Sequence, residues 1–502
     1  MNLSKSKYVT GMKCPKILWM DNNMPEQKVK QDDSRMIIGN MVGDVAKGYF
    51  GEYSEVPIDY KNMAGMIDET QRLLDSDTEV IAEASFSYEG NFCSVDLLRK
   101  VDDGYEIFEA KSSSETADSN PRSIEQKYLD DMAYQYYMLT NCGLNIKRVS
   151  LMVLNKKYVR CGKLDLQQLF VLIDCTEQVQ DMQGTIAGNI REIKTIATSN
   201  EEPLCQIGSR CDKSSKCAYQ DWCFRDLPEH NVYDIRWSLR GDKKDKAYQA
   251  GYVTFADVLN SQTISLNDRQ LMQVQTVVQN LPPHIEVDAI RQFLQTLTYP
   301  LYHFDFETYQ QVIPLFDGVR PYQVIPFQYS IHIQDAPGAA PAHREFLALA
   351  KEEVDNRREL AERLCADIPP NVCVLAYYAS FERSRIRELA AEFPDLAGHL
   401  LQIEANILDL ADPFKNGHYY CREMGGSYSI KVVLPALCPD DPELDYNSLT
   451  LIKDGGDIMK IFASLHEKSP EEVQEIRDAL LAYCRLDTLA MIKVLEKLYG
   501  MV

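Results

Sequence analysis

The chain has 502 residues, of which 45% are hydrophobic and 25% are charged. At about 150 residues a domain, this length excludes a single small binding module and predicts two or three domains. The composition excludes a broadly disordered or collagen-like chain. The 53 basic and 75 acidic side chains give a net charge of −22, which excludes coating of nucleic acid by bulk electrostatics. Local binding that depends on bound cations remains compatible with this charge.

Three regions follow one another along the chain. Residues 1–227 mix helix-like and strand-like segments and end in a cysteine-rich patch, and residues 228–298 show short stretches of helical periodicity. Residues 299–502 alternate strands and helices. We therefore expect two α/β domains joined by a helical connector. No apolar run of about 20 residues and no signal-peptide pattern occurs, which predicts a cytoplasmic protein without a membrane partner.

The first group of candidate site residues lies on a predicted hairpin, residues 91–113, around an Asp-Asp-Gly turn. One register of this hairpin puts Asp96 opposite Glu109, and the other puts it opposite Lys111. In both registers the three side chains share one face, because side chains alternate along a strand. Two carboxylates and a lysine suit metal-assisted hydrolysis of a phosphodiester, with Glu83 as a further candidate ligand. The alternative is the solvated face of an ordinary hairpin.

These residues resemble the P-D...(D/E)-x-K nuclease superfamily, because Asp96 is followed by the motif Glu109-Ala110-Lys111. A predicted helix with Gln135 comes next, where RecB-type members of the superfamily carry a motif glutamine. The resemblance implies a restriction-endonuclease-like α/β/α domain with a catalytic divalent cation. The sequence departs from the pattern at Gly43, where many relatives have a metal-binding histidine, and at Leu139, where a tyrosine is expected.

The second group is a set of cysteines. Cys205, Cys211, Cys217 and Cys223 recur every six residues, which favours a zinc or iron-sulfur site over four unconnected thiols. RecB-like nucleases with an iron-sulfur cluster have one cysteine before the nuclease core and three after it. This chain resembles them with Cys14 as the early ligand and Cys211, Cys217 and Cys223 as the late trio, which implies a structural 4Fe-4S cluster, with Zn²⁺ as the alternative. Cys205 could replace one ligand, and Cys14 is favoured over it.

The other nine cysteines are interpreted as core or incidental residues: Cys93, Cys142, Cys161, Cys175, Cys365, Cys373, Cys421, Cys438 and Cys484.

The third group lies in the last region. Asp305 and Glu307 are two positions apart on a predicted strand, and Tyr483 and Asp487 are four apart on a predicted helix, so each pair shares a face. Together with Glu382, these residues suit a site for two divalent cations, in which the tyrosine orients the attacking water. The alternative for the strand is a plain acidic strand end. We expect the neighbouring His303 to point to the opposite face of the strand and to pack or cap there.

The set resembles the DnaQ-like 3′ to 5′ exonucleases of the RNase H-like fold, in the subclass whose third motif is Tyr-x-x-x-Asp. The first motif is Asp305-Phe306-Glu307, the second runs from Tyr378 to Glu382, and the third is Tyr483 with Asp487. Relatives usually have asparagine and aspartate where this chain has Tyr378 and Glu382. The whole chain, with its RecB-like domain, connector and DnaQ-like domain, resembles a bacterial family of fused nucleases.

The resemblances imply a metal-dependent nuclease that hydrolyses single-stranded or end-bearing DNA, in DNA repair or in defence against foreign DNA. Mg²⁺ or Mn²⁺ is expected at both centres, because the predicted ligands are oxygens. An RNA-processing exonuclease is one alternative, and a nucleic-acid-binding scaffold with degenerate sites is another. A helicase or another protein partner would suit this setting, and the sequence leaves the oligomeric state open.

Overall fold

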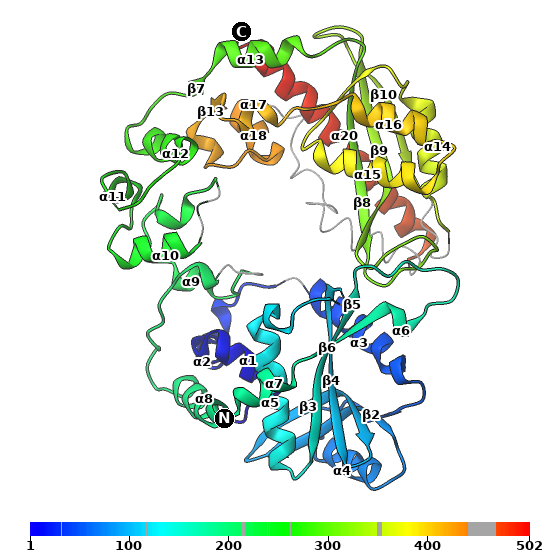
Figure 1. Ribbon diagram of the computed structural model, residues 1–502. Coiled ribbons are helices and arrows are strands. Elements are labelled where there is room, and N and C mark those ends of the chain that lie inside the picture. Colours follow the sequence, from blue (N-terminus) through cyan, green and yellow to red (C-terminus); the bar gives the residue numbers. More distant parts are fainter. Residues whose placement is uncertain are drawn as a thin grey trace. The chain divides into compact units, whose positions relative to one another are not determined.

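The computed structural model shows a mixed α/β protein that divides into two compact units (Figure 1). It describes residues 1–31, 33–116, 118–211, 216–237, 239, 241–261, 263–348, 354–439 and 468–502. Unit 1 comprises Met1–Ile207, Cys211–Arg225 and Val312–Gln323, and unit 2 comprises Gly208–Arg210, Asp226–Gln311 and Val324–Val502. The predicted connector, 228–298, therefore groups with unit 2. In the described part of the chain, no helix is long and apolar enough to cross a membrane.

Unit 1 is built on a six-stranded sheet in which sequence neighbours lie side by side, in the order β1-β2-β3-β4-β5-β6. The strands are β1 Ser54–Glu55, β2 Val80–Tyr88, β3 Asn91–Val101, β4 Gly104–Glu115, β5 Ile146–Asn155 and β6 Phe170–Asp174. The pairs β1/β2 and β4/β5 are parallel, and the other three are antiparallel. The predicted hairpin is confirmed as β3 and β4.

Helices cover both faces of this sheet. The unit-1 helices are α1 Lys5–Lys13, α2 Pro15–Asn23, α3 Ser34–Lys47, α4 Met63–Leu74, α5 Gln126–Asn141, α6 Leu166–Leu169, α7 Thr176–Asp181, α8 Gln183–Ala197 and α9 Gln220–Cys223. One buried cluster joins α1, α4, α5 and α8 to one face, through residues such as Tyr8, Met138 and Ile186. A second cluster joins α3 and α6 to the other face, around Val42 and Phe108.

The start of the chain is fixed to the sheet, and this places helix α1. Ser4 forms a parallel bridge with Phe92 of β3, and the Phe92 amide donates to the Leu3 carbonyl at 2.9 Å. The buried Tyr134 hydroxyl of α5 donates to the same carbonyl at 2.8 Å. Because α1 begins at the next residue, Lys5, its side chain is held beside β3 and α5.

A loop from late in the sequence completes unit 1. In the segment Val312–Gln323, the Val319 carbonyl accepts from the Arg160 amide at 3.0 Å, and the Pro314 carbonyl accepts from the Arg160 guanidinium at 2.8 Å. The Tyr322 hydroxyl donates to the carbonyl of Ser112, the residue after Lys111. The strand that carries Lys111 is therefore anchored by a segment about 200 residues further along the chain.

Unit 2 contains a five-stranded sheet in the order β10-β9-β8-β11-β12. Its strands are β8 Leu301–Gln311, β9 Gln323–Gln334, β10 Ala342–Leu347, β11 Cys373–Ala376 and β12 Ile407–Asp409. β11 is parallel to both β8 and β12, and β9 and β10 are antiparallel. A two-stranded antiparallel sheet pairs β7 (His284–Ile285) with β13 (Tyr419–Tyr420).

The faces of the five-stranded sheet are covered by different helices. The described unit-2 helices are α10 Gly241–Gln249, α11 Phe255–Leu259, α12 Asp268–Val278, α13 Val287–Gln295, α14 Arg357–Asp367, α15 Ser380–Glu392, α16 Ala397–Ala405, α17 Asp412–Lys415, α18 Ile430–Leu437 and α20 Pro470–Tyr499. Tyr302, Phe304 and Phe306 of β8 pack with α14, α15 and α16. Leu301 packs instead with α13, α18 and α20. The even-numbered side chains of β8 therefore face one helical layer, and the odd-numbered ones face α20.

The helical character predicted for 228–298 is confirmed by α10 to α13. Helices α11 and α12 start with capping boxes at Thr254 and Asn267, which satisfy amide groups that a helix start leaves unpaired. The Gln273 side chain of α12 is buried and donates to the carbonyls of Asp234 and Gly425, at 3.0 and 3.2 Å. This contact holds the helical stretch against the rest of unit 2.

Candidate functional site

The β3–β4 hairpin brings the first predicted group together. The observed pairs, such as Leu97 opposite Phe108, follow the register in which Asp96 lies opposite Glu109. The Asp96 carboxylate crosses to the partner strand and accepts from the Ala110 amide at 2.9 Å. Of the two registers that the sequence allowed, the one with an Asp-Asp turn is therefore present.

Two lysines and a second aspartate complete this network. Lys111 Nζ donates to Glu109 Oε1 at 2.5 Å and to Asp131 Oδ2 at 2.8 Å. Gln135, on α5 as predicted, donates to Glu109 Oε2 at 2.7 Å and to Asp131 at 3.1 Å. Lys5 Nζ lies 3.2 Å from Asp96 Oδ1 and 3.1 Å from both oxygens of Glu109. The Lys5 ammonium thus occupies the position between Asp96 and Glu109 that a bridging cation would take.

The electrostatics of this network are nearly balanced. Burial would raise the pKa of Glu109, which has no exposed surface, but Lys111 and Lys5 outweigh burial and lower it to about 2. Burial and the charge of Glu109 raise the pKa values of Asp96 and Asp131. Burial alone would lower the pKa of Lys5, but Asp96 and Glu109 raise it well above its usual value. Three carboxylates therefore face two ammonium groups, and a divalent cation fits only if it displaces Lys5.

Glu83 lies beside this network. β2 pairs with β3 in the same register on both sides of it, with Ala82 opposite Leu97 and Ala84 opposite Val95, so Glu83 is placed level with Asp96. Its φ of 57° is rare for a residue other than glycine, and such backbone strain concentrates at functional sites. Burial and the Asp96 charge raise the pKa of Glu83 to about 7.

Gly43, which stands where relatives have a histidine, lies on α3, and a Cβ atom built on it would contact no atom within 4 Å. The position has room for a side chain that this sequence lacks.

The cysteines also gather within unit 1. Cys14 lies between α1 and α2, and its Sγ is 3.3 Å from Sγ of Cys205. The Cys217 amide donates to the Cys211 carbonyl at 2.7 Å. Burial raises the pKa of Cys223, and the nearby Cys217, Cys211 and Cys205 raise it further. The early cysteine and the late group are thus neighbours, and this all-sulfur set fits an iron-sulfur cluster or zinc.

Other contacts join the two ends of unit 1 around these thiols. The Tyr219 hydroxyl donates to Asp21 at 2.7 Å, and the Val29 amide donates to the Ala218 carbonyl at 2.9 Å. Lys16 donates to Glu202 at 2.6 Å. Since Cys14 and Cys205 already touch, the geometry does not select one of them as the ligand.

In unit 2, β8 and α20 bring the third predicted group together. Asp305 and Glu307 lie on β8 and Asp487 lies on α20, as predicted. One oxygen each of Asp305 and Glu307 and the sulfur of Cys484 lie within 4.8 Å of one another. Asp487 is the charge that acts most strongly on both Asp305 and Glu307. Cys484 follows Tyr483 directly, and sequence reasoning had set it aside as a core residue.

Glu382 lies in the first turn of α15 and is 2% exposed. Within the described residues, its Oε2 atom has no hydrogen-bond partner. The nearby Asp409, at the end of β12, accepts from the amides of Tyr378 and Ala411, each at 3.0 Å. A buried carboxylate oxygen without a donor fits a cation as its missing partner.

Burial and mutual repulsion dominate the electrostatics here. Burial and the charges of Asp487 and Glu307 raise the pKa of Asp305 well above its usual value. Burial and Asp487 do the same to Glu307, against a smaller opposite effect of Lys431. Burial raises the pKa of Glu382 to about 8, and Asp409 contributes in the same direction. A divalent cation fits this site because it would replace the protons that these carboxyls otherwise retain.

Lys431 of α18 was not found by sequence reasoning. Its Nζ atom lies 5.2 Å from the centre of the Tyr483 ring, and its positive charge favours the ionised form of Glu307 and so lowers the pKa of that residue. Tyr483 itself is 3% exposed and packs with Phe327 and Leu480. Five lysines lie between the second and third motifs, and no local spacing singles out Lys431 or connects it to the carboxylates.

The prediction that His303 points away from Asp305 is wrong. Because side chains alternate along a strand, residues 303, 305 and 307 lie on the same face of β8, whereas Phe304 and Phe306 lie on the opposite face. The His303 ring forms a hydrogen bond with the Gln334 side chain at 3.0 Å. The charge of His303 would lower the pKa of His332, whose ring forms a hydrogen bond with Thr488 of α20 at 2.8 Å. His303 is fully buried, and burial lowers its pKa to about 4.

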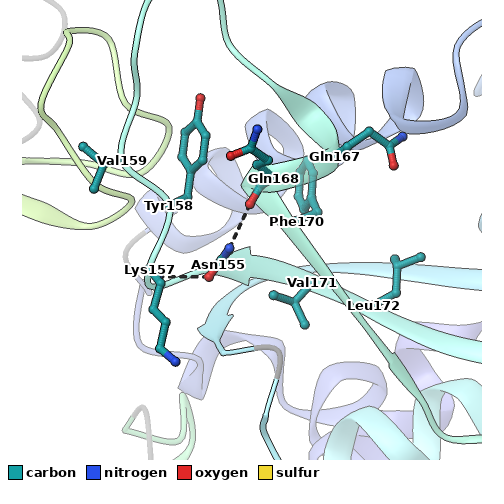
Figure 2. A pocket seen from close by; sticks show the side chains of 9 residues that line it. All are labelled: Asn155, Lys157, Tyr158, Val159, Gln167, Gln168, Phe170, Val171 and Leu172. Carbon is teal, nitrogen blue, oxygen red and sulfur yellow. Dashed lines mark hydrogen bonds between the residues drawn. The ribbon is translucent and has the colours of Figure 1, made fainter.

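A separate hollow of about 360 Å³ lies at the ends of β5 and β6 in unit 1 (Figure 2). It is lined by Asn155, Lys157, Tyr158, Val159, Gln167, Gln168, Phe170, Val171 and Leu172. Asn155 accepts from the Lys157 amide and donates to the Gln168 carbonyl, at 3.0 and 2.9 Å, which closes the loop around the hollow. None of the carboxylates or cysteines described above lines it.

Comparison with known proteins gives one match. A family described as a domain of unknown function (DUF2779) matches residues 302–429. The matched stretch contains Asp305, Glu307 and Glu382, and it ends before Tyr483 and Asp487. No curated protein and no solved structure matches the chain. The match assigns no activity.

The raised pKa values predict how stability depends on pH. Between about pH 5 and pH 8, the unfolded chain has released protons that Glu382 and its neighbours keep in the folded state, so stability should fall as the pH rises. Scanning calorimetry in a chelator should show this fall, and Glu382→Gln should reduce it. The exposed Glu475→Gln on α20 is the matched control. A slope that Glu382→Gln leaves unchanged would contradict the assignment.

The position of Lys5 predicts a second effect. Lys5→Met removes the ammonium between Asp96 and Glu109, so Mn²⁺ should bind unit 1 about tenfold more tightly or better, a gain of ~1.4 kcal/mol. Isothermal titration calorimetry measures this, in an Asp305→Asn background that weakens the unit-2 site. Lys7→Met, an exposed lysine on the same helix, is the control. Unchanged or weaker Mn²⁺ binding would show that Lys5 does not hold the cation position.

Proposed function

We propose that the protein is a metal-dependent nuclease with two centres, of which the unit-2 centre removes nucleotides from 3′ ends. The observation that carries this proposal is the group of acidic side chains Asp305, Glu307, Glu382 and Asp487. Burial raises the pKa values of Asp305, Glu307 and Glu382, and the charge of Asp487 raises those of Asp305 and Glu307 further, so that a cation would be stabilised there. Oxygen ligands at this density favour Mg²⁺ or Mn²⁺. A divalent cation bound there would make water a better nucleophile and stabilise the charge that develops on a phosphate.

The chain's own groups then have distinct tasks in unit 2. Asp305 and Glu307, on β8, would hold the divalent cations that contact the reacting phosphate. Glu382, at the start of α15, would offer its Oε2 atom, which has no hydrogen-bond partner among the residues that the structure describes. Lys431 supplies a positive charge beside the Tyr483 ring, where it can meet a phosphate oxygen while the phenol orients water.

Unit 1 supplies the second centre of the proposal. The carboxylates of Asp96 and Glu109 would hold the cation, Lys111 would stabilise charge on the phosphate, and Gln135 fixes the orientation of Glu109. Glu83 lies where its carboxylate could serve as a further ligand beside that of Asp96. We interpret unit 1 as a restriction-endonuclease-like domain of the RecB type and unit 2 as an RNase H-like domain of the DnaQ type. The helices on both sheet faces support this interpretation.

A second role for unit 1 is favoured by one observation. Lys5 fills the cation position with its own ammonium group. In that state the centre binds a nucleic-acid end as a scaffold and does not cut it, and the unit-2 centre carries out hydrolysis. We prefer DNA over RNA as the substrate and place the protein in the cytoplasm, in DNA repair or defence, with a helicase as a suitable partner.

Substitutions should separate the two centres. Asp305→Asn or Glu307→Gln should lower 3′-end trimming by about 100-fold or more, because each removes a charge from the reacting site. Lys111→Ala should leave that activity unchanged and remove only cleavage by unit 1. The assay uses 5′- and 3′-labelled single- and double-stranded DNA and RNA with Mg²⁺ or Mn²⁺. Unchanged trimming by Asp305→Asn would refute the assignment of unit 2, and better trimming of RNA would change the substrate.

The cysteines predict a coloured cofactor. Anaerobic purification should give a brown protein that absorbs at about 400 nm, with iron bound by Cys211, Cys217, Cys223 and either Cys14 or Cys205. Serine variants of Cys14 and Cys205 should show which of the two is needed, by loss of colour and of bound iron. Cys142→Ser, at an exposed cysteine, is the control. Stoichiometric zinc without iron would replace the cluster with a structural zinc site.

A further inference from the structure

Three aromatic side chains from separate segments of unit 2 form a continuous run. The Trp237 and Tyr428 rings are stacked, with centroids 5.4 Å apart and planes at 24°. The Tyr428 ring lies 5.5 Å from that of Tyr378. At the other end, the exposed Arg269 guanidinium lies 5.2 Å from the centre of the Trp237 ring. We call these four side chains the aromatic run.

Backbone contacts hold the aromatic run in place. The Trp237 carbonyl accepts from the buried Gln270 side chain at 2.9 Å, and the Tyr428 carbonyl accepts from the Tyr377 hydroxyl at 2.7 Å. Trp237 and Tyr378 have φ values of 58° and 63°, which large side chains rarely adopt. Such conformations persist where surrounding contacts enforce them, and they concentrate at functional sites.

One end of the run lies at the carboxylate site. The Tyr378 amide donates a hydrogen bond to the Asp409 carboxylate at 3.0 Å, and the charge of Asp409 raises the pKa of the neighbouring Glu382. The Phe381 amide donates to the Tyr378 carbonyl at 2.9 Å, so both rings belong to the turn that starts α15. Each of these two aromatic residues is 38% exposed, whereas Glu382 in the same turn is buried. The aromatic surface therefore adjoins the side chain that we place in the reacting site.

The surface also carries positive charge in a chain whose net charge is −22. The exposed Arg269 lies at the far end of the run, and the Arg385 guanidinium, which is paired with Glu388 at 2.9 Å, lies 5.2 Å from the centre of the Phe381 ring. Stacked rings flanked by guanidinium groups suit a ligand that has flat aromatic faces and a negatively charged backbone. In a duplex the bases are stacked on one another and their faces are hidden, so a single strand fits better.

We propose that the aromatic run is a stacking platform for the bases of single-stranded nucleic acid, and that it leads the strand's end to Asp305 and Glu307. The proposal rests on the function proposed above and specifies its substrate as a single strand, recognised without regard to sequence because every base has an aromatic face. The exposed ring of Tyr378 contacts a base, the partly exposed Tyr428 and Trp237 extend this surface, and Arg269 contacts phosphates.

Binding of labelled oligonucleotides tests the platform apart from hydrolysis. In full-length protein that carries both Asp305→Asn and Lys111→Ala, so that neither proposed centre cuts the probe, fluorescence anisotropy with Mg²⁺ gives the affinity for oligo(dT) and for an abasic strand of the same length. Adding Tyr378→Ala should weaken oligo(dT) binding at least about fivefold and leave abasic binding unchanged, because only a base can stack. Tyr53→Ala, at an exposed tyrosine of unit 1, is the control and should change neither.

Tryptophan fluorescence gives an independent reading. Oligo(dT) should quench part of the protein's fluorescence, and Trp237→Phe should remove this quenching while keeping most of the affinity, since phenylalanine still stacks. An arm with oligo(rU) shows whether the platform accepts either sugar, and aromatic-dependent binding of either strand supports it.

The outcomes separate this proposal from the proposed function. Unchanged oligo(dT) binding by Tyr378→Ala, or an equal loss on the abasic strand, overturns the platform even if the wild type hydrolyses 3′ ends. Aromatic-dependent binding in a protein that hydrolyses nothing supports the platform and overturns the nuclease.

Discussion

Burial of carboxylates is the constraint on which both candidate sites depend. Removing an ionised carboxylate from water is costly unless a cation or hydrogen-bond donors compensate it. Unit 1 meets this cost with its own lysines, because Lys5 and Lys111 reach the fully buried Glu109. Unit 2 meets it differently, since its carboxyls keep protons at a pH where they are normally ionised. The two sites therefore differ in what a divalent cation must displace, an ammonium group in one and protons in the other.

Distant parts of the sequence supply the groups that set this difference. Lys5 comes from the first helix and meets strands about 90 and 100 residues later, and Asp487 comes from the last helix and meets β8. Each is held by contacts outside the site, such as the bond between Tyr134 and the Leu3 carbonyl. The charge balance at each centre thus depends on packing at the chain ends.

Local periodicity was enough to predict the parts of each site that share one element. The alternation along β3 and β4 correctly placed Asp96, Glu109 and Lys111 together, and helical spacing placed Gln135 on α5. Local periodicity could not identify Lys5 as part of the site, because the sequence of a helix does not indicate which strands the helix packs against.

The same limit applies to Cys484 and to Trp237. Cys484 was grouped with buried cysteines, and it is buried, but only the crossing of α20 over β8 shows that it adjoins Asp305. Trp237 lies in a stretch with no recognisable motif, and its stacking on Tyr428 joins residues about 190 positions apart. The error on His303 was of another kind, since period-two alternation puts residues 303 and 305 on the same face.

The segment Val312–Gln323 has a consequence for how the protein can be taken apart. It belongs to unit 1, yet β8 precedes it and β9 begins within it and continues into unit 2. Separating the units therefore requires more than one cut. A fragment that ends near residue 227 would lack the tyrosine that bonds the carbonyl after Lys111 and the carbonyls that receive Arg160. The second unit expressed alone would carry a loop without its packing surface. Swapping either half between relatives would therefore have to exchange the loop along with the first 200 residues.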